Sequence, residues 1–178
     1  MIIETTVTNA APIRMSMLPG DLRQHWKRCG MTADFLAQSA ASFQPRATTI
    51  ISTVINELLE NAIKYSATDE APIDVALSVQ NDTVHCEIKN WAKFEDANSM
   101  DSYFKAIETQ DIDELYFLQL EKSATTTDHH SKMGLLGVIH DYPVTLGCQI
   151  RSTSDQLTPF QISINATINL SEVHHYHG

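Results

Sequence analysis

The apolar periodicity of the segment after Pro45 is the feature that most constrains the fold. Its apolar residues recur at i, i+3, i+4, i+7, i+11 and i+14, spacings that place them on one face of an α-helix. These residues are Ile51, Val54, Ile55, Leu58, Ala62 and Tyr65. An apolar stripe of this length is stable in water only when another layer of the protein covers it. The segment therefore predicts a long helix that packs against a second layer.

Several other segments alternate apolar and polar residues, which is the period of a β-strand. The predicted strands are 13–18, 73–79, 84–89, 144–152 and 159–170. Asn81-Asp82 suits a tight turn, so the second and third strands should pair antiparallel. Residues 21–43 predict two helical pieces, with Gly30 as the interruption and Thr32 as a candidate N-cap.

Residues 93–132 are polar and poor in strand signals, and they form a candidate mobile lid. Helices are expected within it at 100–107 and 112–120, and a further short helix at 134–139. The resulting order is strand, helices, two strands, lid, helix and two strands. It predicts the α+β class, a two-layer α/β sandwich with a mainly antiparallel sheet and its helices on one face.

Length and composition bound the class of protein. A chain of 178 residues suits one domain over 1–178, with 171–178 expected as a flexible tail. It has 22 acidic and 12 basic residues, a net charge of −10, which argues against nucleic acid as a partner. Three separated cysteines signal neither a disulfide framework nor a zinc knuckle. No segment has the pattern of a signal peptide or a membrane span, so a cytoplasmic protein with no membrane partner is expected.

Polar residues follow one flank of the long helix. At about 100° per residue, Glu57 and Asn61 lie about 40° apart around the helix and about 6 Å apart along its axis. Lys64 lies within reach of the same flank. An acid, a neutral oxygen ligand and a cation suit phosphoryl transfer, because Mg²⁺ prefers oxygen donors and phosphates need positive charge. The alternative is an ordinary polar border of an amphipathic helix, and spacing alone favours that alternative.

The residues 56–66, NELLENAIKYS, resemble the N-box of the GHKL ATPase superfamily, whose domain is called the Bergerat fold. This superfamily includes sensor histidine kinases, gyrase-type ATPases and the serine kinases that act as anti-sigma factors. The resemblance implies that Asn61 coordinates the Mg²⁺ of bound ATP and that Glu57 is the general base. It also implies a basic residue near the phosphates at Lys64. The chain is most similar to small bacterial ATP-binding regulators of the anti-sigma-factor and partner-switching type.

The later family motifs are altered in this chain. Where the family has Asp-x-Gly-x-Gly, residues 90–94 read Asn-Trp-Ala-Lys-Phe. The oxygen of Asn90 can accept a hydrogen bond from adenine, less strongly than a carboxylate does. Ala92 and Phe94 narrow the space that glycines leave, so Phe94 either stacks on the base or blocks it.

The glycine-rich box of the lid is altered as well. Gly134 and Gly137 stand three apart, and Ser131-Lys132 precede them. A glycine motif that opens a helix can offer backbone N–H groups to phosphates. The alternative is close packing of that helix on the sheet.

Histidines do not predict a metal site. His129-His130 are adjacent and diverge, and His174, His175 and His177 cluster in the expected tail without ligand spacing. His140-Asp141 forms either a base and its orienting acid or a cap at the end of the short helix.

Three classes of function follow from these residues. The first is an Mg²⁺- and ATP-dependent regulator that transfers the γ-phosphoryl group to a serine or threonine of a protein partner. For that partner the resemblance implies a STAS-type antagonist or a sigma-like factor, and for the chain itself a homodimer. The second is an inactive module that acts only by docking. A hydrolase built on His140 is the third, and it leaves the N-box unexplained.

Overall fold

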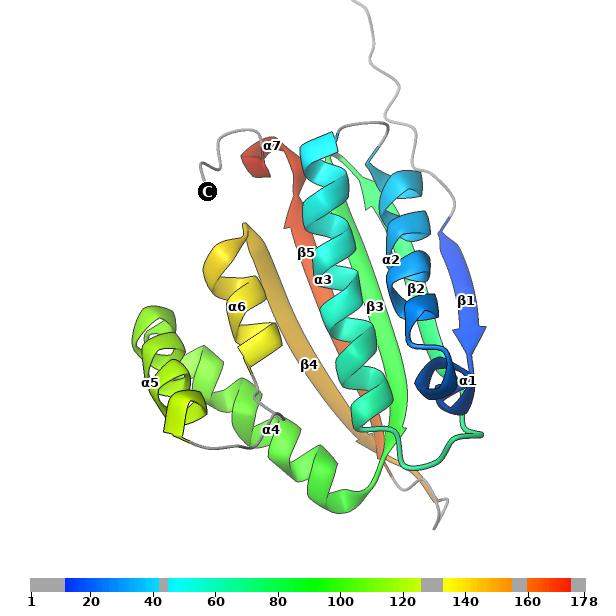
Figure 1. Ribbon diagram of the computed structural model, residues 1–178, viewed down its shortest axis with the longest axis vertical. Coiled ribbons are helices and arrows are strands. Elements are labelled where there is room, and N and C mark those ends of the chain that lie inside the picture. The colour runs from blue at the N-terminus through cyan, green and yellow to red at the C-terminus, as the bar shows by residue number, and fades with distance from the viewer. Residues whose placement is uncertain (1–11, 42–44, 126–132, 155–159, 174–178) are drawn as a thin grey trace, which may run out of the picture.

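The computed structural model describes residues 12–41, 45–125, 133–154 and 160–173. Within these residues, five strands form a sheet in the order β1-β2-β3-β5-β4 (Figure 1). The strands are β1 (Ile13–Met17), β2 (Ile73–Gln80), β3 (Thr83–Ala92), β4 (Val144–Ser152) and β5 (Phe160–Asn169). All neighbouring strands pair antiparallel. β1 and β4 are therefore the edges of the sheet.

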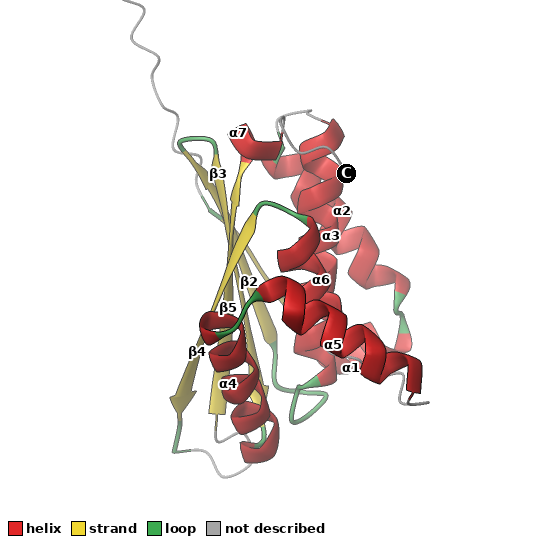
Figure 2. Ribbon diagram, turned by 90° about the vertical axis from the view of Figure 1, so that its left-hand side faces the viewer, coloured by secondary structure: helices red, strands yellow, loops and turns green. Residues whose placement is uncertain are grey.

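The helices lie on one side of this sheet (Figure 2). They are α1 (Pro19–Gln24), α2 (Lys27–Ala40), α3 (Pro45–Lys64), α4 (Phe94–Thr109), α5 (Ile112–Thr125), α6 (Met133–Asp141) and α7 (Leu170–Val173). α3 crosses the middle of the sheet beside α2, and α5 packs on the outer side of α6. The predicted α+β sandwich is confirmed.

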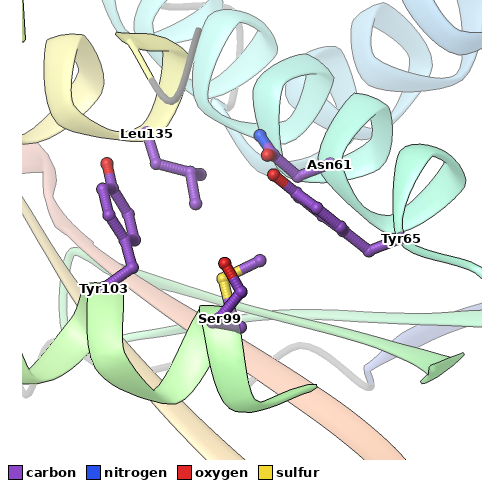
Figure 3. Close-up of a pocket in the computed structure, with 6 residues that line it drawn as sticks. Asn61, Tyr65, Ser99, Tyr103 and Leu135 are labelled. Carbon is purple, nitrogen blue, oxygen red and sulfur yellow. The ribbon is translucent and has the colours of Figure 1, made fainter. Parts of the chain in front are cut away.

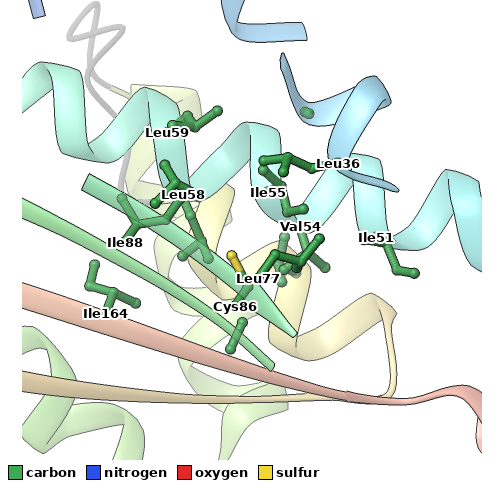
Figure 4. Packing of buried hydrophobic residues seen from close by; sticks show 14 of the residues in the cluster. Leu36, Ile51, Val54, Ile55, Leu58, Leu59, Leu77, Cys86, Ile88 and Ile164 are labelled. Atoms are coloured by element: carbon green, nitrogen blue, oxygen red, sulfur yellow. The ribbon is translucent and has the colours of Figure 1, made fainter. Parts of the chain in front are cut away.

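The core forms where the apolar stripe of α3 meets the sheet (Figure 4). Ile51, Val54, Ile55 and Leu58 are all at most 1% exposed. The facing side of β3 carries every second residue: Val84, Cys86, Ile88, Asn90 and Ala92. The helical period of 3.6 and the strand period of 2 thus bury complementary surfaces, as the sequence predicts.

The turn between β2 and β3 is the predicted one. Asn81 and Asp82 have φ values of 49° and 58°, the left-handed region that a two-residue hairpin turn requires. The two strands flank it in antiparallel register.

The first helical region departs from prediction in the position of its break. The interruption expected at Gly30 lies instead at His25 and Trp26, between α1 and α2, and His25 has a non-helical backbone. Gly30 is inside α2, and Thr32 is not an N-cap: its hydroxyl lies 3.8 Å from the sulfur of Met17. Burial of the α2 face outweighs the low helix propensity of one glycine.

The segment 93–132 contains more helix than the sequence predicts. α4 begins at Phe94 rather than residue 100, and α5 extends to Thr125 rather than residue 120. Residues 126–132, with His129, His130, Ser131 and Lys132, lie outside the described residues. The lid function stays a prediction.

The C-terminal part also contains structure where a tail was expected. Residues 171–173 belong to α7, and the side chain of Val173 is 1% exposed. The remaining residues 174–178, with their three histidines, lie outside the described part of the chain. Among the helices that are described, none combines the length and apolarity needed to cross a bilayer.

Candidate functional site

A small cavity lies where α3, α4 and α6 meet. It is lined by Asn61 and Tyr65 from the end of α3, Ser99, Met100 and Tyr103 from α4, and Leu135 from α6. In Figure 3, Asn61 and Tyr65 face Ser99 and Tyr103 across this space. Its volume of about 10 Å³ holds about one water molecule. The three helices thus leave a narrow seam between them, lined by both polar and apolar side chains.

Asn61 presents an oxygen to this seam. Its Nδ2 donates a hydrogen bond of 2.7 Å to the backbone carbonyl of Glu57, one helical turn earlier. This bond occupies the nitrogen and leaves Oδ1 as the end that can ligate a cation. A neutral amide oxygen is a donor that Mg²⁺ accepts. The position of Asn61 is therefore compatible with the predicted role.

Glu57 lies on the same flank, but its carboxylate is turned to α6. A Cβ placed on Gly134 would lie 1.9 Å from Oε2 of Glu57, so the carboxylate sits directly against this glycine. Glu57 is half-buried and does not line the cavity. Burial raises the pKa of Glu57, and the charge of Glu60 adds to the increase. A carboxylate with a raised pKa is a stronger proton acceptor than an exposed one.

Tyr103 connects α4 to the first turns of α6. Burial raises the pKa of its hydroxyl, and the nearby Tyr65 adds to the increase, while a backbone hydrogen bond with Leu136 acts in the opposite direction. Its lining neighbours Ser99 and Met100 stand four and three residues earlier, on the same face of α4. Sequence reasoning missed this wall. The spacing of Ser99, Met100 and Tyr103 on a predicted helix was the signal that could have revealed it.

The residues that stand where the family has Asp-x-Gly-x-Gly differ in their burial. Asn90 is 3% exposed on the helix-facing side of β3, and its Nδ2 has no hydrogen-bond partner among the described residues. Ala92 is fully buried at the end of the same strand. Phe94, by contrast, is 59% exposed and packs against Phe160, with ring centroids 5.7 Å apart. Phe94 does not line the cavity, and its predicted stacking on a base or blocking of it stays a prediction.

The remaining predicted residues lie around the site rather than in it. Lys64 is exposed, with Nζ 5.1 Å from the centroid of the Tyr65 ring. Gly134 and Gly137 both belong to α6, and only Gly134 is in close contact with α3. A Cβ on Gly137 would meet Tyr116 at an ordinary 4.0 Å. The structure brings Glu57, Asn61 and Gly134 together and leaves Gly137 and Phe94 apart.

The contacts or burial of His140 and the three cysteines explain their positions without a role in the cavity. His140 stacks on Tyr116 of α5 at 4.1 Å, and its Nδ1 lies 2.6 Å from Asp141. Burial raises the pKa of the Cys29 thiol to about 11. The thiols of Cys86 and Cys148 have pKa values raised to about 12 for the same reason, so all three are protonated at neutral pH. Among the described residues, no group of three His, Cys, Asp or Glu side chains could hold a metal ion.

Comparison with known proteins identifies a related fold. No protein-family profile matches the chain, and no curated protein matches it in sequence. A chain in the crystal structure of the SiaB–SiaC complex from Pseudomonas aeruginosa is similar, with a TM-score of 0.64 and 18% sequence identity. The likeness covers 92% of this chain and 93% of that chain. At this identity the comparison shows the shared α+β sandwich.

Proposed function

We propose that this protein is an ATP-binding signalling regulator of the GHKL type, which transfers a phosphoryl group to a protein partner. One observation carries the proposal. Asn61 and Glu57 stand one turn apart on α3, where α4 and α6 meet it, with Asn61 Oδ1 at the cavity and the pKa of Glu57 raised. This pairing matches the roles that the N-box resemblance implies.

The roles follow from the chemistry of each group. Bound Mg–ATP supplies the phosphoryl group to be transferred, and Asn61 Oδ1 is assigned to its ion. Glu57 takes the proton of the acceptor hydroxyl as the new oxygen–phosphorus bond forms and ADP leaves. Lys64 offers positive charge at the end of α3. Gly134 lets the backbone of α6 lie close to the carboxylate of Glu57, because glycine has no side chain.

The polar groups in this region are of the kind that bind a nucleotide, but the cavity is too small to contain one. The buried Nδ2 of Asn90 has no hydrogen-bond partner within the described part of the chain, and the residues that line the cavity include Asn61 and Ser99, which carry side-chain oxygens. A volume of about 10 Å³ cannot contain a purine. Binding therefore requires α4 or α6 to move away from α3, as the lid interpretation expects.

A protein partner is part of the proposal. The similar fold occurs in a complex of SiaB with SiaC. We assign to this chain a partner whose serine or threonine accepts the phosphoryl group, of the STAS-type or sigma-like class that the N-box resemblance implies.

A second candidate function is a docking module that does not transfer phosphate. The position of Glu57 favours it, because the carboxylate contacts Gly134 and does not face the cavity. In that case the N-box is a structural element of α3 and the partner binds without catalysis.

Titration calorimetry with ATP and ADP, with and without Mg²⁺, tests the proposal. We expect Asn61→Ala to weaken the magnesium-dependent affinity about tenfold or more. Asn56→Ala is the matched control, because Asn56 lies on the same helix and donates its amide to Glu60. Glu57→Gln should retain binding and lose transfer to a verified partner. Binding that is unaffected by Asn61→Ala would refute the site, and no binding at millimolar nucleotide would favour the docking module.

A further inference from the structure

The end of α3 carries part of the cavity wall and has no glycine to terminate the helix. Asn61 and Tyr65 line the cavity there, and Lys64 is the last residue of the helix. A glycine just after the last turn commonly ends a helix, because its left-handed backbone satisfies the free carbonyls. Residues 65–68 read Tyr-Ser-Ala-Thr, without such a glycine. The carbonyls at the end of α3 therefore need other donors.

Arg23 of α1 supplies donors to this end from another helix. Its Nη2 donates hydrogen bonds of 2.6 Å to the carbonyl of Ile63 and 3.3 Å to the carbonyl of Ser66. These carbonyls stand on either side of Lys64 and Tyr65, so one guanidinium holds the backbone that carries both residues. Its positive charge also complements the negative C-terminal end of the helix dipole.

Two contacts with Asp69 fix α1 against the loop after α3. The backbone N–H of Gly20 donates a hydrogen bond of 3.2 Å to the carbonyl of Asp69. A Cβ on Gly20 would lie 2.9 Å from Cβ of Asp69, so this close approach requires glycine. Nη1 of Arg23 forms an ion pair with the carboxylate of the same residue. α1 is thereby held at the position from which Arg23 reaches α3.

The same loop also connects α3 with the opposite wall of the cavity. The backbone N–H of Ala67 donates a hydrogen bond of 2.7 Å to the carbonyl of Trp91, near the end of β3. Three residues after Trp91, α4 begins, and it supplies that opposite wall. A displacement of the end of α3 would therefore change its spacing from α4 as well as the position of Asn61.

We infer that Arg23 is a positioning residue of the nucleotide site. It holds the last turn of α3 so that Asn61 is placed for the magnesium ion and Lys64 for the phosphates. This inference rests on the proposed nucleotide binding. Arg23 does not line the cavity, so it acts through the backbone carbonyls of Ile63 and Ser66.

Substitution can separate the carbonyl bonds of Arg23 from its ion pair. Arg23→Met keeps an aliphatic stem and removes every donor. Asp69→Asn removes the ion pair and leaves the donors to α3 in place. An ion pair between side chains that are 38% and 61% exposed contributes little, so Asp69→Asn should have the smaller effect.

The test is titration calorimetry with Mg–ATP on the wild-type chain and on both variants. We expect Arg23→Met to weaken the affinity about tenfold or more, as does the loss of a residue that orients a metal ligand. Asp69→Asn should weaken it less than about fivefold. Without Mg²⁺ the loss in Arg23→Met should be smaller, because Asn61 then has no ion to bind.

Val173→Ala separates positioning from a general loss of stability. Val173 is 1% exposed in α7, which lies beside the start of α3, whereas α1 lies beside its end (Figure 1). The variant should lower the melting temperature and leave the affinity for Mg–ATP unchanged. Equal losses of affinity in Val173→Ala and Arg23→Met, or an unchanged affinity in Arg23→Met, would overturn the inference and leave the proposed function intact. Absence of Mg–ATP binding by the wild type would overturn both.

NMR spectra of the ligand-free protein provide a readout that does not require nucleotide. Nδ2 of Asn61 is bonded to the carbonyl of Glu57, so the signals of this side-chain amide report on the last turns of α3. Arg23→Met should shift them. The side-chain amide of Asn169, which is bonded to Glu172 in α7, is the control and should not shift. Unshifted signals of Asn61 in Arg23→Met would overturn the inference.

Discussion

The helices α3 and α6 both border the cavity, but they are held in place differently. α3 has 20 residues, and its buried stripe faces the middle of the sheet. α6 has nine residues and reaches α3 through the contact of Gly134 with Glu57. It also lies against α5, the edge strand β4 and Tyr103 of α4. The difference indicates that α3 is the fixed wall of the site and that α6 is a wall that moves more easily.

Removing a core side chain from α3 should have the largest effect. Leu58 is 1% exposed, so Leu58→Ala should lower the free energy of unfolding by about 2–5 kcal/mol. Leu118→Ala on α5 is the control, because Leu118 is 48% exposed and its truncation should change stability by less than about 0.5 kcal/mol. Urea unfolding measures both. Equal losses would contradict the assignment of α3 as the fixed wall.

The two glycines of α6 should respond in opposite ways. Gly137→Ala should stabilise the protein by about 1 kcal/mol, because alanine favours a helix and a Cβ fits beside Tyr116. Gly134→Ala should lose this gain, because its Cβ displaces the carboxylate of Glu57. The measurement is a double-mutant cycle with Glu57→Ala, in which the coupling of Gly134 should be about 0.5–3 kcal/mol and that of Gly137 near zero. Equal coupling of both glycines would refute the contact.

A substitution where α6 contacts α5 should have a smaller effect on stability. His140 stacks on Tyr116, and its Nε2 lies 3.7 Å from Asp113 of α5. His140→Ala should weaken the attachment of α5 by about 0.5–1.5 kcal/mol, the range for aromatic pairs. Hydrogen exchange should show faster exchange in α5 and no change in α3. Unchanged exchange in α5 would show that other contacts hold this helix.

The smallest expected effect is the change with pH in the contribution of Glu57 to the free energy of unfolding. The pKa of Glu57 is raised in the folded protein above its usual 4.5 by burial and by Glu60, so the folded state binds more protons there than the unfolded state. Its contribution to stability is thus present below pH 4.5 and is lost as the pH rises through the folded value. Glu57→Gln cannot titrate, so its stability relative to wild type should increase as the pH rises from 4.5 through the raised folded-state pKa of Glu57. Chemical unfolding at several pH values measures this difference, and a constant difference would contradict the raised pKa.

The sequence predicted only the residues that α3 contributes to the candidate site. Glu57 and Asn61 could be placed on one flank of α3 because a helix has a fixed angle per residue. Their different orientations could not be predicted, since the carboxylate of Glu57 turns towards Gly134, 77 residues later in the chain. The wall formed by Ser99 and Tyr103 was missed because it depends on how α4 packs against α3.

The sequence by itself determined the α+β class, the long helix α3 and the β2–β3 hairpin. Each follows from a local pattern: an apolar stripe with the period of a helix, alternation with the period of a strand, and Asn81-Asp82 at the turn. Only the tertiary structure decided that Gly134 contacts Glu57 and that Phe94 lies outside the cavity. It also decided that Asn90 is buried with no hydrogen-bond partner for its Nδ2 among the described residues. The physical reason is that these features depend on contacts between distant segments, and local periodicity does not encode which segments meet.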